Sequence, residues 1–471
     1  MTNSQSSKDV TAADSEDSTP DSQTRDGGVV GWLVVLGSLI CHIFVGGAFQ
    51  AIGPLFVVIQ SHFDETSART SWIIAFLVSV EFGLAPISNV FVKKIGFRMT
   101  VLLGTIISST GYFISAFAPT IEFLYLSIGL AIGLGYAIIL PACIGIKAFF
   151  IKKRFPIANV LAGSGAGLGV FIFPPLLQTL IDNYGWKGAV IVFSALNAQM
   201  GIAAALFRAP EEHNRSASKS EEDVKIAKSS RTCLTSAVDT CDFWLLKKFP
   251  TFAIFVLATG ISDGIGYQGS PSHMLARAKT KHIGSITDIS LLVSIFGLAT
   301  IIGRLVIPIL LYLTGKYTTS LKLYSVAIVL SGTCNLFSPL ASNYGGYSTY
   351  AFIYGLFMGI VMGIRPQIAR DILGPEKVTA GIGLMKFCIA FGALIGPPTG
   401  GYIYDVTDEY DNSFYFYGSL LVFGGLMILV LEPLTTRRQR TLEGVTNVIV
   451  DEPCRYSVSF LEVATQTGEK H

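Results

Sequence analysis

The sequence predicts an all-α membrane protein in which twelve transmembrane helices form two pseudo-symmetric bundles of six. Three observations lead to this fold class. About a dozen apolar stretches are each long enough to cross a bilayer, because a hydrocarbon core of roughly 30 Å needs about 20 apolar residues per helix. A polar segment over residues 208–248 divides these stretches into two sets of six. Short motifs of the first set recur in the second set.

The composition excludes several other classes of protein. Hydrophobic residues make up 51% of the 471 residues and charged residues only 14%, and a soluble domain of this size could not bury so much apolar surface. A net charge of +2 without a strongly basic face argues against a nucleic-acid partner. The seven cysteines lack CxxC or zinc-site spacing and the six histidines are scattered, so we expect no metal, no cofactor and no enzyme activity.

The apolar stretches and the polar segments between them divide the chain into five parts. Residues 1–28 are rich in Ser, Thr, Asp and Gln and are expected to form a disordered cytoplasmic tail. The first bundle covers residues 29–207, the central cytoplasmic loop 208–248, the second bundle 249–433 and a C-terminal tail 434–471. The expected helices begin at Gly31, Ser71, Met99, Phe123, Pro156 and Gly188, and then at Phe249, Asp288, Ser320, Gly346, Val378 and Ser413.

The distribution of basic residues predicts the orientation in the membrane. Loops that the order of helices places on one side carry Lys93, Lys94, Arg98, Lys147, Lys152, Lys153 and Arg154. The loop over residues 405–411, on the other side, has four acids and no base, although the outer loop with Arg277, Lys279 and Lys281 is basic. Since positively charged loops stay in the cytoplasm, both termini are expected to be cytoplasmic, in a multi-pass protein surrounded by membrane lipid.

The two halves of the chain repeat each other. The letters FGLA at residues 82–85 recur at 296–299, and a Pro-Pro pair followed by Asp at residues 174–182 recurs with identical spacing at 397–405. Both matches connect one predicted helix with the sixth helix after it, as expected of two parallel six-helix repeats. This relation indicates a two-lobed transporter that moves its substrate by alternating access around a central site.

Two further motifs indicate a family. The segment 149–159, with Lys152, Lys153 and Arg154 ahead of a Gly/Ala-rich helix, resembles the fifth-helix signature of the monocarboxylate transporter family, the solute carrier 16-like branch of the major facilitator superfamily. Asp26-Gly27-Gly28 before Trp32 resembles the first-helix signature of that family. The resemblance extends from Asp26 to about Arg440. It implies a carrier of a monocarboxylate in the plasma membrane, which in some members needs a single-span ancillary glycoprotein.

Departures from the family pattern leave the driving force open. The first-helix Lys that the best-known members use for lactate and proton coupling falls on Ala51, next to Gln50, a candidate cavity residue. The eighth-helix Asp and Arg of the family read as Thr300 and Arg304. The resemblance therefore implies an anion-binding Arg304 without its relay partners, in a proton symporter or a facilitative carrier. A carrier of a neutral, zwitterionic or aromatic solute without proton coupling, or a non-transporting receptor, is the alternative.

Charged residues inside the predicted helices are the other candidate site residues, because each costs roughly 2.5–3.5 kcal/mol at the bilayer centre. Arg304 could hold a carboxylate in bidentate fashion, and the alternative is an ion pair with Asp263 in the seventh helix. Arg365 could bind substrate, or it could extend to the interface or pair with an acid. The glycine-rich segment 260–269 around Asp263 could allow a gating helix to unwind.

Glu81 and Lys386 are expected to form an ion pair between the two bundles. Their distances along the second and eleventh helices place them at similar depths, about 15 Å and 12 Å from opposite surfaces. We expect this pair to form or break during alternating access, while the basic loops at residues 93–98 and 152–154 act as partners of the cytoplasmic gate. The alternative for Glu81 is a proton carrier.

Overall fold

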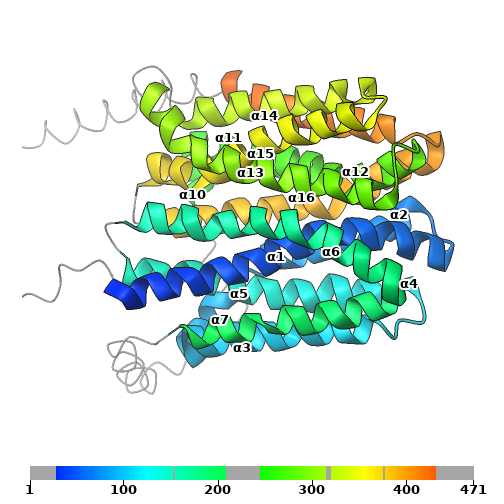
Figure 1. Cartoon of the computed structure of the whole chain (residues 1–471). Helices are drawn as coiled ribbons and strands as arrows, with labels where there is room; N and C mark the ends of the chain where they lie inside the picture. The colour runs from blue at the N-terminus through cyan, green and yellow to red at the C-terminus, as the bar shows by residue number, and fades with distance from the viewer. Residues whose placement is uncertain (1–27, 152–153, 208–243, 315–319, 375–376, 431–471) are drawn as a thin grey trace, which may run out of the picture.

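The computed structural model describes residues 28–151, 154–207, 244–314, 320–374 and 377–430, and every regular element in these ranges is a helix. The helices run nearly parallel to one long direction (Figure 1). We call the end where the first helix begins the Gly28 end and the end where it finishes the Phe63 end. This arrangement confirms the predicted all-α fold.

The first half of the chain forms one bundle. Its elements are α1 (Gly28–Phe63), α2 (Ser67–Gly83), α3 (Ile87–Ser115), α4 (Ile121–Leu124), the π-helix η2 (Tyr125–Ile132), α5 (Gly133–Phe150), α6 (Phe155–Ala198) and α7 (Met200–Ala205). The backbone leaves the helical conformation inside α3 at Gly96, with φ of 77°, and inside α6 at Gly185, with φ of 66°. Because glycine adopts positive φ without steric cost, the chain can turn at both positions, and each label covers two helical segments.

The second half forms the other bundle. Its elements are α10 (Trp244–Lys248), α11 (Pro250–Thr259), the π-helix η3 (Gly260–Tyr267), α12 (Gln268–Thr280), α13 (Ile286–Thr314), α14 (Ser320–Phe337), the 3-10 helix η4 (Ser338–Leu340), α15 (Tyr344–Leu373), α16 (Val378–Thr407) and a last helix over Tyr410–Val430. Helical segments of both bundles begin within about one turn of the starts predicted from the sequence. The glycine-rich seventh segment, where unwinding was considered, is helical throughout and forms η3.

Eight helices in the described part of the chain are long and apolar enough to cross a membrane. They include α1, α15 and the last helix, with mean hydropathies of 2.3, 1.4 and 1.8 over their most apolar windows. Large apolar side chains remain exposed along the outside of both bundles, for example Ile106, Leu257 and Ile309. A soluble protein would bury such side chains, whereas lipid accommodates them, so this is an integral, multi-pass membrane protein.

The two bundles meet along three helix pairs. α2 packs on α16, α6 packs on α13, and α1 packs on α12. In Figure 1 the helices of the first half form the lower layer and those of the second half the upper layer. Small residues allow the backbones to approach closely, as where Gly167 of α6 lies against Thr300 and the carbonyl of Gly297 in α13. Groups on these facing helices are therefore positioned between the bundles.

Candidate functional site between the bundles

Seven ionisable side chains form a connected group near the contact between the bundles, which we call the central charge cluster. Its members are His42 of α1, Glu81 of α2, Lys147 of α5, Asp263 of η3, Arg304 of α13, Arg365 of α15 and Lys386 of α16. Each interacts electrostatically with at least one other member. Leaving His42 aside, the four cationic side chains and two carboxylates have an excess of two positive charges.

Arg304 reaches from the second bundle to the first. Its Nη1 donates a short hydrogen bond to the carbonyl oxygen of Gly163 in α6, and its Nη2 lies 3.4 Å from Sδ of Met362. The side chain is only partly buried. A β-carbon built at Gly163 would meet no other atom within 4 Å, so free space adjoins this contact. The guanidinium is therefore held at the bundle interface, with open space beside it at Gly163.

Asp263 pairs with Arg365 rather than with Arg304. An Nη2 to Oδ2 distance of 2.5 Å joins Arg365 to Asp263, and the Tyr324 hydroxyl donates to the same Oδ2 at 3.0 Å. Asp263 is fully buried, so a nearby cation offsets the cost of its charge. The pairing considered for Arg304 is thus absent among the described residues, whereas the pairing of Arg365 with an acid is present. Arg304 keeps its charge available for a ligand.

The structure brings Glu81 and Lys386 to neighbouring helices but does not join them. Glu81 is 2% exposed, and neither of its carboxylate oxygens has a hydrogen-bond partner within the described ranges. The Lys386 ammonium lies 5.4 Å from the ring centre of Phe82, a cation–π distance, and interacts with the Glu81 charge from beyond the 4.0 Å limit of a contact ion pair. The predicted ion pair between them stays a prediction.

Two further ionisable residues were not identified as site residues from the sequence. Lys147, counted above among the loop residues, is instead fully buried in α5, where its Nζ donates to Oδ1 of Asn159 at 3.1 Å. His42 lies in the middle of α1 with its Nδ1 2.7 Å from the Ser38 carbonyl oxygen. The sequence signal that could have identified both residues is a charged or titratable residue within an apolar stretch. A boundary error of about one turn placed Lys147 outside the helix.

The remaining candidates for substrate contact occupy different surroundings. Thr300 donates to the Gly297 carbonyl of its own helix at 2.7 Å, so its hydroxyl hydrogen is already used. Gln50 has a buried Oε1 without a partner in the described structure. It precedes Gly53 by one turn on α1, and Gly53 lies opposite Leu275 of the second bundle. Gln50 is therefore near the bundle interface with an acceptor to offer.

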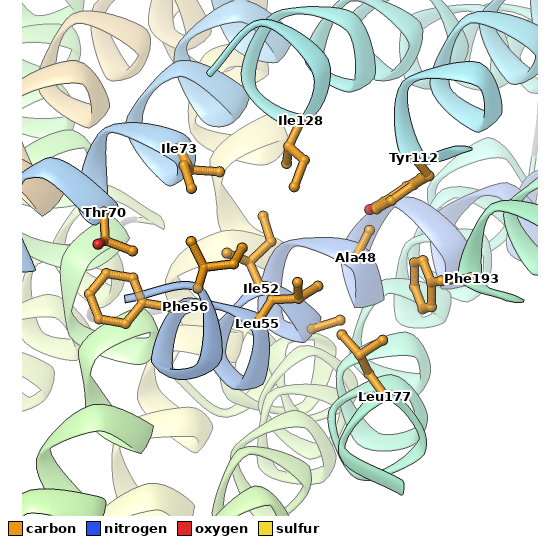
Figure 2. A pocket seen from close by; sticks show the side chains of 12 residues that line it. Ala48, Ile52, Leu55, Phe56, Thr70, Ile73, Tyr112, Ile128, Leu177 and Phe193 are labelled. Atoms are coloured by element: carbon orange, nitrogen blue, oxygen red, sulfur yellow. The ribbon is translucent and has the colours of Figure 1, made fainter. Parts of the chain in front are cut away.

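Ala51 points instead into the first bundle. It is 2% exposed and lines a cavity of about 10 Å³ together with Ile52, Tyr112 and other mostly apolar residues. Figure 2 shows their side chains converging from α1, α2, η2 and neighbouring helices. Such a space holds no more than about one water molecule, and its lining offers little for a polar solute to bind. The cavity is a packing gap of the first bundle.

The predicted partners of the cytoplasmic gate lie at the Gly28 end. Lys93, Lys94 and Arg98 are exposed around the turn at Gly96, and Arg154 is exposed just before α6. Lys152 and Lys153 lie outside the described residues. The gate role of these cations stays a prediction.

Side-chain contacts hold the bundles together at the Phe63 end. The Asp405 carboxylate accepts hydrogen bonds from the backbone N–H groups of Ser67 at 2.9 Å and Ala68 at 2.8 Å. It thereby satisfies donors at the N-terminus of α2 from the opposite bundle, where the helix dipole also favours a negative charge. His273 of α12 joins Ser71 of α2, at 3.0 Å from Nε2, to Tyr417 of the last helix, at 3.1 Å from Nδ1.

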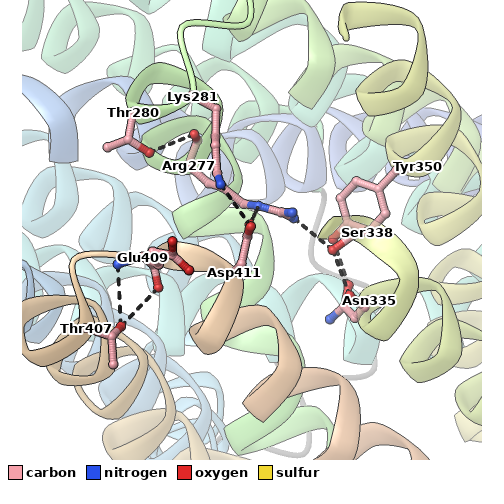
Figure 3. Close-up of polar contacts among 9 residues, drawn as sticks. All are labelled: Arg277, Thr280, Lys281, Asn335, Ser338, Tyr350, Thr407, Glu409 and Asp411. Carbon is pink, nitrogen blue, oxygen red and sulfur yellow. Dashed lines mark hydrogen bonds and ion pairs between the residues drawn. The ribbon is translucent and has the colours of Figure 1, made fainter. Parts of the chain in front are cut away.

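An ion pair with a buried arginine engages two cations of the basic loop that the sequence places on the outer side. Arg277 is 1% exposed, and its Nε donates to Oδ1 of Asp411 at 2.7 Å while its Nη1 donates to Ser338 at 2.8 Å. Lys281 contacts the other oxygen of Asp411 at 3.0 Å, and this hydrogen bond raises the pKa of Lys281. Figure 3 shows both cations directed toward Asp411. Two of the three cations of this loop, Arg277 and Lys281, thus share the carboxylate of Asp411.

A groove of about 620 Å³ opens at the same end of the molecule. Residues of α1, α12 and the α16 region line it, among them Gln60, Asp64, Lys279, His282 and Tyr404. Asp64 and His282 adopt positive φ, at 53° and 52°, where the chain turns after α1 and α12. Residues of both bundles line the groove, which lies next to the contacts made by Asp405 because Tyr404 is among its lining residues.

Comparison with known proteins identifies relatives of the whole chain. The Major Facilitator Superfamily family model matches residues 38–316 and 264–462. The chain is 26% identical over 422 residues to Monocarboxylate transporter 12 of Xenopus laevis, covering 86% of this chain and 88% of the relative. It is 28% identical over 406 residues to Monocarboxylate transporter 6 of Mus musculus, covering 84% and 86%. The crystal structure of a mutant of the nucleoside transporter NupG superposes with a TM-score of 0.65 at 13% identity, covering 85% of this chain and 99% of that one.

Proposed function

Because this chain belongs to the major facilitator superfamily and is related over most of its length to monocarboxylate transporters, we propose that it carries a small organic anion, a monocarboxylate, across a membrane by alternating access. The superfamily and the relatives establish a membrane transporter and not an enzyme. The anionic substrate, the twelve spans, the orientation and the plasma membrane are parts of the proposal.

The observation that carries the proposal is the positive excess of the central charge cluster. Arg365 is compensated by Asp263, and Glu81 can offset one of the other cations, which leaves Arg304 beside free space and two cations in all without an acidic partner. A charged side chain without an acidic or basic partner is costly inside a membrane. A bound carboxylate about 4 Å from a cation would recover roughly 4 kcal/mol at an effective dielectric constant of 20. A neutral solute would leave this cost in place, so an anion fits best.

The contacts between the bundles fit a carrier closed at the Phe63 end. Asp405 and His273 join the bundles there, and we assign this end to the outside because the basic residues 93–98 and Arg154 lie at the other. The turns at Gly96 and Gly185 divide α3 and α6, which brings the proposed number of membrane crossings to twelve. The division of the chain into two tails, two bundles and a central loop, with boundaries at residues 28, 207, 248 and 433, is also part of the proposed topology.

We also propose that Glu81 and Lys386 change their separation during the transport cycle. Ser79 of α2 donates to the Ala390 carbonyl of α16 at 2.8 Å, so the two helices are in contact two residues before Glu81. A small rotation of one bundle would bring the carboxylate and the ammonium together or separate them further. Glu81 is buried and has no hydrogen-bond partner in the described ranges, so its charge is costly. Moving the Lys386 ammonium toward it would lower this cost, and moving it away would raise it.

The proposal is tested by counterflow in proteoliposomes loaded with unlabelled carboxylates. Labelled L-lactate, pyruvate, butyrate and benzoate are offered to the wild type and to Arg304→Ala, Arg304→Lys and Arg69→Ala. Arg69 is the control, since it is an exposed arginine at the Phe63 end that pairs with Glu65 and Glu122. Removing one partner of a buried charge contact costs about 2 kcal/mol or more, so Arg304→Ala should weaken apparent affinity at least roughly 30-fold.

The results distinguish the proposed function from its alternatives. Arg304→Lys should retain part of the affinity, because it keeps the charge without the bidentate geometry, and Arg69→Ala should resemble the wild type. Saturable binding without counterflow would indicate a receptor. Counterflow of neutral or aromatic solutes alone, unaffected by Arg304→Ala, would contradict the anion proposal.

A further inference from the structure

One nitrogen of the His42 ring has no hydrogen-bond partner among the described residues. Its Nδ1 lies 2.7 Å from the Ser38 carbonyl oxygen, and because a carbonyl can only accept, Nδ1 carries a hydrogen. In the neutral ring the other nitrogen, Nε2, is then an acceptor, and it has no hydrogen-bond partner among the described residues. The side chain is only partly buried although it lies in the middle of α1. A proton can therefore be accepted at Nε2 without breaking an existing contact.

The charged groups that act on His42 are all cations. Lys147 comes from α5, Arg304 from α13 and Lys386 from α16. The contact from α6 is made by Gly165, where a β-carbon would lie 3.2 Å from Cβ of His42. The two carboxylates of the central charge cluster are directed elsewhere, since Asp263 pairs with Arg365 and Glu81 interacts with Lys386. Without a bound anion, protonation of His42 would add a fourth positive charge, which the three cations would repel from three helices.

A bound carboxylate would reverse this balance. Arg304 contacts the carbonyl oxygen of Gly163 and also acts electrostatically on His42, so an anion held at its guanidinium would act on both groups. An anion at this position is attracted by Arg304 and at the same time offsets the repulsion that the three cations would exert on a protonated imidazole. Binding of anion and proton is then mutually favourable, and the coupling is the same whichever binds first.

We propose that His42 is the proton-coupling residue of this transporter, and that its Nε2 takes up one proton together with each carboxylate. This inference rests on the proposed anion transport. The proton comes from water on the side from which the anion enters and returns to water where the anion leaves. A monocarboxylate and one proton then cross together without net charge. His42 thereby supplies the titratable group that Ala51 and Thr300 lack.

Purified protein in proteoliposomes tests this role. The carboxylate of the four-member panel with the largest Arg304-dependent counterflow is used, and proton entry is recorded with an internal pH-sensitive dye alongside uptake of label. The variants are His42→Gln, which is permanently neutral, Glu81→Gln, which removes the other candidate proton carrier, and the control His282→Gln in the groove at the Phe63 end. Size-exclusion profiles verify folding, and counterflow reports anion exchange that needs no net proton movement.

We expect one proton per anion in the wild type, and a one-unit pH gradient, acid outside, should accumulate the anion roughly tenfold. His42→Gln should lose both proton entry and accumulation and should weaken the apparent affinity for the anion in counterflow, while His282→Gln keeps all three. If His42→Gln does not fold, the proton-to-anion ratio of the wild type still tests whether transport is coupled to protons. A ratio of zero overturns the inference.

Two other outcomes also overturn the inference. Proton entry that persists in His42→Gln excludes His42, and if Glu81→Gln then abolishes it, the role belongs to Glu81. Absence of counterflow for every member of the panel contradicts the proposed function itself, and the coupling role fails with it. Counterflow without proton entry overturns only the coupling role.

Discussion

Asp405 is predicted to hold the transporter closed at the Phe63 end, and Asp405→Asn should weaken that closure. The carboxylate accepts from the backbone N–H groups of Ser67 and Ala68 across the bundle interface. Asparagine has a single carbonyl oxygen and no charge, so it keeps at most one of these bonds. Both bonds join parts of the molecule that must separate when this end opens.

The expected effect follows from these two losses. A hydrogen bond to a charged group contributes about 1.5–3 kcal/mol, and a negative charge at a helix N-terminus typically adds about 0.3–1 kcal/mol. New contacts made by asparagine recover part of the lost free energy, so the closed end should be destabilised by about 2 kcal/mol. Since about 1.4 kcal/mol changes an equilibrium tenfold, the population open at the Phe63 end should rise about 30-fold while it remains the minor state.

Cysteine labelling measures this population. Leu275 is buried on α12 opposite Gly53 of α1, so Leu275→Cys places a thiol between the bundles. A membrane-impermeant maleimide should label it about 30-fold faster in Asp405→Asn. Asp408→Asn, in the same loop and at the end of α16, serves as the control. A change of less than twofold in Asp405→Asn would refute the assignment of Asp405 to closure.

Two other predictions concern buried charges. Arg277→Met should destabilise the folded protein by about 3–5 kcal/mol, because it leaves Asp411 without its main partner; thermal unfolding in detergent measures this, and a loss below about 1 kcal/mol would show that the pair contributes little. Glu81→Gln and Lys386→Met should each lower turnover per molecule at the surface, since each leaves one charge uncompensated between the bundles. In a double mutant, partial recovery of turnover would support the pair, whereas turnover no better than that of either single variant would count against it.

The sequence predicts the architecture well because apolar length alone determines where a helix can cross a bilayer. The starts at Ser320 and Val378 match the structure. The repeated letters at residues 82–85 span the end of α2, and those at 296–299 lie inside α13 of the other bundle. The Gly/Ala-rich helix noted after residue 154 includes Gly167, where the two bundles approach closely. These features depend on local sequence, which a single chain displays directly.

The partners of the charged residues could not be obtained in this way. Depth along a helix placed Glu81 and Lys386 at similar levels, but rotation about the helix axis decides that Lys386 lies over Phe82. In the same way, Asp263 was considered as a partner of Arg304 and is found with Arg365. His42 gave no signal beyond a histidine in an apolar stretch, and its neighbours come from three distant helices. Tertiary packing determines these contacts.

The most direct test of the account compares carboxylates with amides of the same shape. Wild-type proteoliposomes are loaded with L-lactate, butyrate or benzoate, and entry of the labelled carboxylate and of the corresponding lactamide, butyramide or benzamide is measured. If the positive excess around Arg304 selects an anion, at least one carboxylate should show saturable, trans-stimulated entry while its amide does not. Equal entry of both members of every pair, or trans-stimulated entry of the amides alone, would contradict the account.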